Sequence, residues 1–546
     1  MTKYYIGDNS WFIGKWSKFD DNVFTPYPLA EKVVNLLSWK DKDYLDFIES
    51  TNLGIIDMGA KLGNLLVAFA RRATQAIENT DYSETKKDAL FKTLRNKLWA
   101  LPATSVTAFY IETLYQDNNW NQDNILYPKN SGQSNSFGLD IVRLVKIYHD
   151  NPDRIDDSGN HNLPQKERNT WDKHFTSITE MKGIGEVSPE EIMGMVKLLA
   201  TGNFDIAVGN PQYHNAESGD GTGATATYHY FMQAAQITAN TVSMIYPSRW
   251  LTGGRGEGIE SFRNTELNSQ NYVSFVLDPN PDIFDTITVE GGINYFVWEK
   301  GRTGTTQYIY GNEKPEERST LLNNKTAFIR EPRFSEILDK VNPQQVMKPN
   351  TRYYGEQLHS EPKVNNLIEE VNETTETTTV YYSGSSGGIK TAQVPKDATT
   401  RTLDGYKVFI SVTAHARQDS LRRPNRILIG KPGEICSSSY AVIPDLPTQD
   451  AAENLLRYLK TDLATFLLGI ITPTQHAYSK VYRLIPEINP VTGEILDHPG
   501  IFLDFENDLD EQLFEIYEFS EEQQQTITQS IRAWRDKDSV TADGMY

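Results

Sequence analysis

The stretch LGIIDMGAKLGNLLVAFARRA, residues 53–73, decides the fold class of this chain. Its first four residues, 53–56, are mostly apolar and predict a short buried strand. Residues 57–63 predict a tight turn with two glycines, and the apolar spacing of residues 64–73 predicts a helix. A strand, a glycine turn and a helix in this order open an α/β unit. Such a turn brings a helix N-terminus to a ligand at the sheet edge, although a purely structural turn has the same pattern.

Similar units follow downstream. The segment LWALPATSVTAFYIETLY, residues 98–115, predicts a second strand and helix. In residues 187–200, Ser188 and Glu191 have the spacing of a capping box ahead of a helical pattern. Strands and helices alternate in this way over residues 50–300, which favours a mostly parallel, doubly wound sheet of the Rossmann-like type.

The composition excludes several classes of protein. The chain has 546 residues, 38% of them hydrophobic, and no apolar run approaches the roughly 20 residues that a membrane span needs. The N-terminus lacks the pattern of a secretion signal, so we expect a cytoplasmic protein that contacts no membrane. A single cysteine, Cys436, excludes an internal disulfide and a cysteine-cluster zinc site. The nine histidines show no metal-ligand pairing on a helix, and we therefore expect no metal.

A second motif, FDIAVGNPQYH at residues 204–214, runs from a predicted strand directly into an amide, a proline and an aromatic ring. An amine conjugated to a purine is a poor nucleophile, and the Asn210 side-chain carbonyl and the Pro211 backbone carbonyl are suitable acceptors to orient it. Tyr213 would stack on the base, an interaction of about 1–3 kcal/mol. The alternative interpretation is a turn that follows a buried strand and ends in a core tyrosine.

The motifs in this order resemble the gamma-class adenine-N6 DNA methyltransferases of Type II restriction-modification systems. FTP at 24–26, DMGAKLGN at 57–64 and NPQY at 210–213 resemble the N-terminal motif, the loop for S-adenosylmethionine (SAM) and the catalytic Asn-Pro-Pro-Tyr of that family. Further segments similar to large methylases of this kind are residues 243–263, 283–300, 451–468 and 474–486.

The resemblance implies a Rossmann-like SAM-dependent methyltransferase domain followed by an α+β target-recognition region. Its reaction would be sequence-specific methyl transfer from SAM to the N6 of a flipped-out adenine in duplex DNA, without a metal. The implied catalytic residues are Asn210, Pro211 and Tyr213. The implied cofactor-binding residues are Phe24, Thr25, Pro26, Asp57, Gly59, Lys61 and Gly63.

The chain departs from the family pattern at three places. Lys61 replaces a glycine of the SAM loop, Gln212 replaces the second catalytic proline, and no acid follows LWALP, where many relatives bind the ribose. Lys61 is compatible with the loop if its side chain points out of it, because Gly63 remains for the close approach. The departures keep open an alternative, a catalytically inactive, methyltransferase-like DNA-binding or specificity subunit. A third reading keeps the enzyme but replaces DNA by RNA or a protein glutamine.

The predicted domains are a catalytic domain over residues 1–310 and a C-terminal recognition region over residues 401–546, which ends in an acidic helical tail. Residues 117–170 are rich in Asn, Asp, Gly and Pro and predict a loop-rich insertion. Residues 311–400 form a linker and the start of the recognition region. Within them the Thr-, Ser- and Gly-rich segment 369–393 predicts a hinge or an exposed hairpin.

Candidate DNA contacts come from basic side chains. The net charge of −20 argues against nonspecific coating of nucleic acid, but residues 415–431 carry five basic side chains and one acidic one. The DNA-binding residues that we predict are Arg249, Arg255, Arg417, Arg422, Arg423 and Arg426. Because FTP lies within 26 residues of the start, we expect any restriction endonuclease to be a separate subunit. The expected role is restriction-modification or phage defence.

Overall fold

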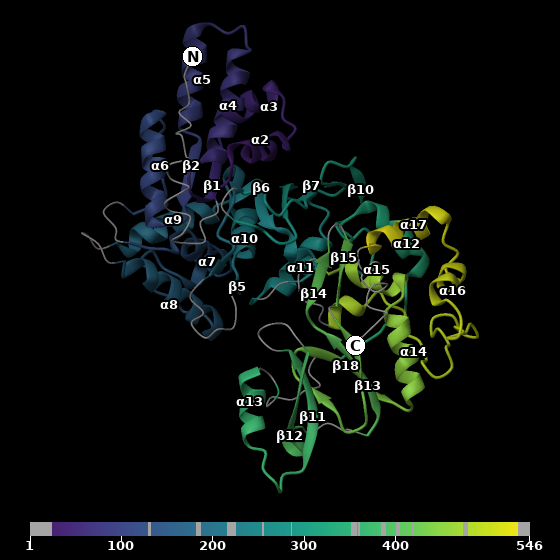
Figure 1. The fold of residues 1–546 in the computed structure, drawn as a ribbon. Coiled ribbons are helices and arrows are strands. Elements are labelled where there is room, and N and C mark those ends of the chain that lie inside the picture. The colour runs from purple at the N-terminus through teal and green to yellow at the C-terminus, as the bar shows by residue number, and fades with distance from the viewer. Residues whose placement is uncertain are drawn as a thin grey trace. The chain divides into compact units, whose positions relative to one another are not determined.

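The chain forms two compact units, Met1–Phe328 and Ile329–Tyr546, in a computed structural model (Figure 1). The structure describes residues 24–128, 133–181, 187–215, 225–253, 256–284, 287–350, 358, 361–383, 389–399, 404–417, 420–424, 426–472 and 479–532.

A twisted sheet is the centre of the first unit. Among the described residues its strand order is β10-β9-β7-β8-β6-β3-β1-β2. The four strands β2, β1, β3 and β6 run parallel to one another, and β8 is antiparallel to both β6 and β7. The bounds are β1 Ile55–Ala60, β2 Leu98–Pro102, β3 Phe204–Gly209, β6 Ala239–Pro247, β7 Tyr272–Asp278, β8 Ile293–Glu299, β9 Thr306–Tyr310 and β10 Glu316–Arg318. The predicted mostly parallel sheet is therefore confirmed.

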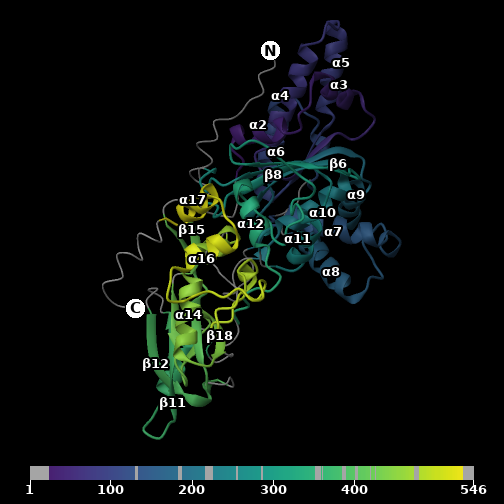
Figure 2. The same ribbon diagram turned by 90° about the vertical axis from the view of Figure 1, so that its right-hand side faces the viewer.

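Helices cover both faces of this sheet. Successive side chains of a strand point to opposite faces, and in β1 Ile55 belongs to one apolar cluster while Ile56 belongs to the other. One cluster packs under α2, α3 and α4, and the other under α7, α9 and α10, on the two sides seen in Figures 1 and 2. The helices are α2 Tyr27–Asn35, α3 Asp41–Glu49, α4 Asn64–Glu78, α5 Glu84–Arg95, α6 Ser105–Asp117, α7 Phe137–Asp150, α8 Gln165–Thr179, α9 Pro189–Ala200, α10 Tyr228–Thr238 and α11 Ile259–Leu267. The unit is thus doubly wound, as predicted.

The predicted loop-rich insertion at residues 117–170 is wrong in its central part, because α7 lies there and α8 begins there. Leu139, Val142 and Val145 recur at helical spacing on α7 and are buried. The Asn, Asp, Gly and Pro residues that suggested loops fall mainly in the connections at the ends of the helices. Apolar spacing therefore outweighs composition in this segment.

The predicted turn at residues 57–63 is also shorter than expected. β1 continues to Ala60, and Asp57 pairs with Ala100 on one side and with Val208 on the other. A central strand forms backbone hydrogen bonds with a neighbour on each edge. This pairing extends β1 into Asp57 and Gly59, although residues of these types suggest a turn.

The second unit is α+β. Its strands form two three-stranded sheets, β12-β11-β17 and β16-β13-β18, and a two-stranded ribbon of β14 and β15. The described elements are α12 Ser335–Val341, α13 Glu361–Glu369, β11 Thr377–Ser383, β12 Ile389–Pro395, β13 Tyr406–Ser411, β14 Ala414–Arg417, β15 Ser420–Pro424, β16 Ile427–Gly430, β17 Ile435–Cys436, β18 Tyr440–Leu446, α14 Gln449–Leu459, α15 Asp462–Ile470, α16 Leu509–Ile516 and α17 Glu521–Ser530.

Two predictions concern this unit. The segment 369–393 contains the antiparallel pair β11 and β12, so the hairpin and not the hinge is found, and residues 311–400 carry α12 and α13 as well as this pair. The acidic tail folds into α16 and α17. In both, a short side chain at the N-cap, Asp508 or Ser520, accepts a hydrogen bond from the first turn.

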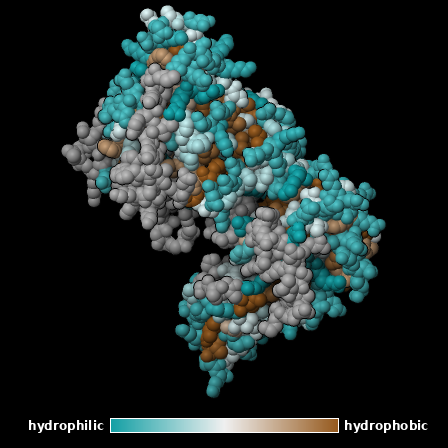
Figure 3. Space-filling model, turned by 45° about the horizontal axis from the view of Figure 1, so that its top comes forward, coloured by the Kyte–Doolittle hydropathy of each residue, from teal (hydrophilic) through white to brown (hydrophobic). Residues whose placement is uncertain are grey.

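The longest apolar run of the sequence lies in α15, which has nine residues. Within the described ranges we find no helix that is both long and apolar enough to cross a membrane. The face shown in Figure 3 is mainly hydrophilic, with hydrophobic residues in limited patches. Most of the apolar side chains that the structure describes are buried in the cores of the two units.

Candidate active site

The end of β1, where the glycine loop begins, is in contact with the Asn-Pro-Gln-Tyr motif after β3. β1 and β3 are parallel neighbours, with Asp57 opposite Val208, so their carboxyl ends meet at one edge of the sheet. A Cβ atom built on Gly59 would lie 3.3 Å from the Cα atom of Pro211, and one built on Gly209 would lie 2.5 Å from the Met58 carbonyl oxygen. Pairing of the strands thus brings together two motifs that lie far apart in the sequence.

Two glycines shape the loop. Gly59 has φ +89° and Gly63 has φ +71°, conformations that residues with a Cβ rarely adopt. Gly63 precedes the first residue of α4, and a Cβ there would lie 2.4 Å from the Leu114 side chain of α6. The loop can therefore follow this close path only with glycine at both positions.

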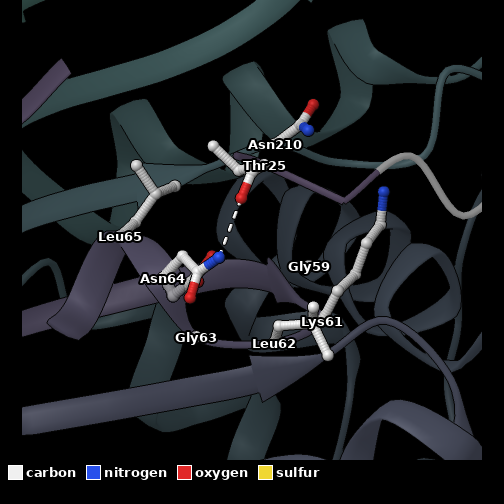
Figure 4. Close-up of a pocket in the computed structure, with 9 residues that line it drawn as sticks. Thr25, Gly59, Lys61, Leu62, Gly63, Asn64, Leu65 and Asn210 are labelled. Atoms are coloured by element: carbon white, nitrogen blue, oxygen red, sulfur yellow. Dashed lines mark hydrogen bonds between the residues drawn. The ribbon is translucent and has the colours of Figure 1, made fainter. Parts of the chain in front are cut away.

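The N-terminal FTP segment is bound to this loop. The Asn64 amide Nδ2, in the first turn of α4, donates a hydrogen bond of 2.9 Å to the Thr25 carbonyl oxygen (Figure 4). Pro26 precedes α2, and the Pro26 carbonyl accepts from the backbone N–H groups of Leu29 and Ala30. Phe24 is half-buried and lies outside the residues that line the pocket. The sequence analysis assigned no role to Asn64, although its position directly after Gly63 in the loop motif is a usable signal.

Residues from all three motifs line one pocket (Figure 4). The lining residues are Thr25, Asp57, Gly59, Lys61, Leu62, Gly63, Asn64, Leu65 and Asn210. The structure thus places five of the seven predicted cofactor residues and the predicted catalytic asparagine in a single pocket. Pro211 and Tyr213 follow Asn210 along the chain and lie beside it, with Pro211 against Gly59.

Asp57 is the buried acid of this pocket. Its side chain is buried, and its Oδ1 atom has no hydrogen-bond partner among the described residues. Burial raises the pKa of the Asp57 carboxyl to about 7, and the positive charge of Lys61 opposes that rise. This oxygen can therefore accept a hydrogen bond from a ligand that enters the pocket, and the ionised carboxyl can pair with a cation there.

Lys61 replaces a glycine of the family's loop, and its side chain is buried. Lys61 lines the pocket and is only 5% exposed. In Figure 4 its side chain extends from the loop toward the side of the pocket where the Asn210 amide lies. Lys61 and Asp57 line the same pocket, and the charge of Lys61 favours the ionised form of the Asp57 carboxyl.

The Asn-Pro-Gln-Tyr segment is held by α10 and by aromatic packing. Thr227, at the start of α10, donates its hydroxyl to the Gln212 carbonyl at 2.8 Å, and its backbone N–H donates to the Tyr213 carbonyl at 3.2 Å. These bonds restrain the backbone where the family has a second proline. The Tyr213 ring is buried, with its centroid 6.5 Å from that of Phe284, and burial raises the pKa of its phenol.

Of the predicted DNA-binding arginines, Arg249 lies beside this motif. It is half-buried, and its Nη2 atom lies 2.7 Å from the Nε2 atom of His214, which directly follows Tyr213. Its charge opposes the effect of burial on the pKa of Tyr213. Arg255 lies outside the described residues. The structure thus places Arg249 next to the candidate catalytic motif.

The remaining predicted arginines are in the second unit. Arg417 ends β14, and Arg422 and Arg423 lie on β15, its antiparallel partner; the side chain of Arg417 is not described. Arg426 directly precedes β16. Arg422, Arg423 and Arg426 are half-buried, and the Arg422 Nη1 atom donates to the Ala414 carbonyl. Strand pairing thus gathers the cluster on one ribbon and the strand that follows it.

The fold and the site define a class. A doubly wound sheet carries a glycine loop before a helix and an Asn-Pro-Gln-Tyr motif on the next strand, at the edge where such folds bind ligands. This is a Rossmann-like arrangement with a candidate ligand site at the carboxyl ends of its parallel strands.

Part of the chain matches the model of a known protein family. Residues 76–284 match the model of the Eco57I restriction-modification methylase family. The matched segment contains the Asn-Pro-Gln-Tyr motif and begins after the glycine loop. The predicted resemblance to restriction-modification methylases is confirmed.

Similar proteins include one curated relative and several solved structures. An uncharacterized adenine-specific methylase of Mycoplasma pneumoniae is 27% identical over 106 residues, 19% of this chain and 25% of that protein. A nuclease-deletion mutant of the Type ISP restriction-modification enzyme LlaGI in complex with a DNA substrate mimic has 10% identity and a TM-score of 0.46, over 86% of this chain and 53% of that chain. The Type IIL restriction-modification enzyme MmeI in complex with DNA has 9% identity and a TM-score of 0.44, over 95% and 78%. The chain thus spans a quarter of the curated relative and about half of the LlaGI chain.

Proposed function

We propose that this protein is a site-specific, adenine-N6 DNA methyltransferase that uses SAM as the methyl donor. The observation that carries the proposal is the single pocket lined by Thr25, Asp57, the glycine loop and Asn210, with Pro211 packed on Gly59. The family match over residues 76–284 supports methylation within restriction-modification.

The pocket suits the cofactor. Glycines 59 and 63 leave room for a close approach, and the Asp57 Oδ1 atom, without a partner among the described residues, is an acceptor for the ammonium group of a methionine. The N-terminal segment that Asn64 binds through Thr25 would cover the same end of the ligand. When bound, SAM supplies an electrophilic methyl group on a sulfonium.

The residues beyond the pocket would position the adenine. The Asn210 side-chain carbonyl and the Pro211 carbonyl accept hydrogen bonds from N6, which aims its lone pair at the methyl group. Tyr213 contacts the face of the flipped base and so offsets the cost of unstacking it. Catalysis then rests on orientation and on fixed dipoles, since direct transfer requires no covalent enzyme intermediate.

The wider role follows from the same family. Duplex DNA would bind to the second unit through Arg417, Arg422, Arg423 and Arg426, with Arg249 near the extruded base. The protein would act in restriction-modification or phage defence in the cytoplasm, with a separate restriction endonuclease subunit as partner. Within the described residues no group of His, Cys, Asp and Glu is arranged to hold a metal ion.

A second candidate function is a catalytically inactive DNA-binding or specificity subunit. The observation that favours it is the buried Lys61 side chain, which takes up space in the pocket. SAM binding distinguishes the two functions, because an inactive scaffold with a blocked pocket would bind none.

The test is methyl transfer from labelled SAM to unmethylated genomic DNA. We expect N6-methyladenine from the wild type and a loss of about 100-fold or more in Asn210→Ala, since one preorganised polar group contributes on that order. Asn264→Ala, an exposed asparagine of α11, is the matched control and should retain full activity. A wild type that neither binds SAM nor labels DNA would contradict the proposal.

A further inference from the structure

Lys61 is a cation in a pocket that would receive a cationic ligand. The sulfonium and the ammonium of SAM are both positive, so a buried lysine beside them repels the ligand unless an anionic group of the ligand faces the lysine. The α-carboxylate of the methionine end is the one anionic group that SAM carries. A lysine in this place therefore requires a definite orientation of the ligand.

Asp57 supplies the second point of attachment. It lines the same pocket as Lys61, and its Oδ1 atom is buried without a hydrogen-bond partner in the described part of the chain. A pocket with one buried carboxylate and one buried ammonium is complementary to the two charges of an α-amino acid. Each of the two side chains would then make a charge-assisted hydrogen bond with the ligand group of opposite charge.

We infer that Lys61 binds the α-carboxylate of the methionine end of SAM, while Asp57 receives the α-ammonium group. Both side chains line the same pocket, and the charge of Lys61 favours the ionised form of the Asp57 carboxyl. This inference rests on the proposed function and adds a specificity-determining residue to it. The glycine usual at this position in the family offers no side chain, so the carboxylate contact would be a property of this chain.

The test compares two ligands that differ only in the carboxylate, SAM and decarboxylated SAM, by calorimetric titration of the full chain. We expect the wild type to bind SAM at least about 10-fold more tightly, which is about 1.4 kcal/mol. Lys61→Met should lower the affinity for SAM by that factor and leave the affinity for decarboxylated SAM unchanged or higher. Lys61→Arg should restore part of the preference. Lys92→Met, an exposed lysine of α5, is the control and should keep the wild-type values.

The outcomes separate this inference from the proposed function. Equal wild-type affinities for the two ligands would overturn the role of Lys61 and leave a SAM-binding enzyme, and this measurement needs no variant. A loss in Lys61→Met that is equal for both ligands would make the lysine a structural residue, and tighter SAM binding by the variant would make it an obstruction. Absence of binding for both ligands in the wild type would contradict the proposed function itself.

Discussion

At the scale of single residues, the position of Asp57 on a buried strand conflicts with its role as a polar group of the pocket. It lies on a central strand, where burial favours an apolar side chain, and it lines the pocket, where a ligand needs an acceptor. Burial raises its pKa to about 7, so near neutral pH the folded protein holds a carboxyl that the unfolded chain would ionise more readily.

The pH dependence of stability follows from this shift. The ordinary pKa is 3.8 and the folded one is about 7, so the stability linked to Asp57 is complete below pH 3.8 and is lost as the pH rises to 7. In Asp57→Asn no carboxyl ionises at this position, so the variant keeps its stability as the pH rises from 3.8 to 7. Its free energy of unfolding should then exceed that of the wild type by a few kcal/mol, at ~1.4 kcal/mol per pKa unit. Urea unfolding at several pH values measures the gap, with Asp88→Asn as an exposed control. A gap that does not change with pH would refute the assignment.

Tyr213 supports a second prediction. Its hydroxyl is buried and has no hydrogen-bond partner within the described residues, so Tyr213→Phe should change the free energy of unfolding by less than about 0.5 kcal/mol. The variant should also keep most of the methylation activity, because in the proposed mechanism the ring and not the hydroxyl would contact the base. Tyr213→Ala should lose about 3–5 kcal/mol of stability together with the activity. Chemical denaturation and the methyl-transfer assay provide both measurements; a Phe variant as inactive as the Ala variant would give the hydroxyl a role.

At the scale of elements, the contact between the loop after β1 and the segment after β3 depends on glycine. Gly59 has a positive φ, and a methyl group there would press on Pro211 and on Phe231 of α10. The two motifs would then move apart, although each would keep its own sequence.

Gly59→Ala should therefore destabilise the protein by at least ~1 kcal/mol, the cost of a left-handed conformation for a residue with a Cβ, and weaken SAM binding. Gly194 is the matched control: it is exposed inside α9, and a Cβ there meets nothing within 4 Å. Gly194→Ala should stabilise the protein by about 0.5–1 kcal/mol through helix propensity. Thermal unfolding and SAM titration of both variants test this pair, and equal effects at the two sites would exclude a special role for Gly59.

At the scale of the whole molecule, the two units have separate proposed roles, cofactor binding in the first and DNA binding in the second. The pocket lies entirely in the first unit, and the arginine ribbon lies in the second. Changes to the ribbon should thus affect DNA affinity and leave cofactor binding intact.

Arg422→Gln combined with Arg423→Gln should weaken DNA binding at all sequences. The slope of log affinity against log salt should fall by about 1 for each phosphate group that the variant no longer binds. SAM affinity should remain at the wild-type value. Lys363→Gln, an exposed change on α13, controls for the removal of charge alone. Fluorescence anisotropy over a salt series provides the slopes, and unchanged slopes would place the DNA elsewhere.

The sequence by itself determined the elements that local pattern encodes. Period and capping predicted β1, β3, α4 and α9, and the order of the motifs predicted the class of fold. The spacing of Leu139, Val142 and Val145 also encodes α7, but the polar residues on either side of that helix favour loops by composition. The information for α7 is therefore local and present in the sequence, although the composition of the segment conceals it.

Only the tertiary structure decided the features that depend on residues distant in the chain. Parallel pairing of β1 with β3 puts Gly59 against Pro211, and the Asn64 side chain binds Thr25 across the pocket. Strands on both sides of β1 bury Asp57, and the folded loop buries Lys61 in the same pocket. Local sequence carries no record of such neighbours, because burial and electrostatic attraction are set by what packs around a residue once the chain has folded.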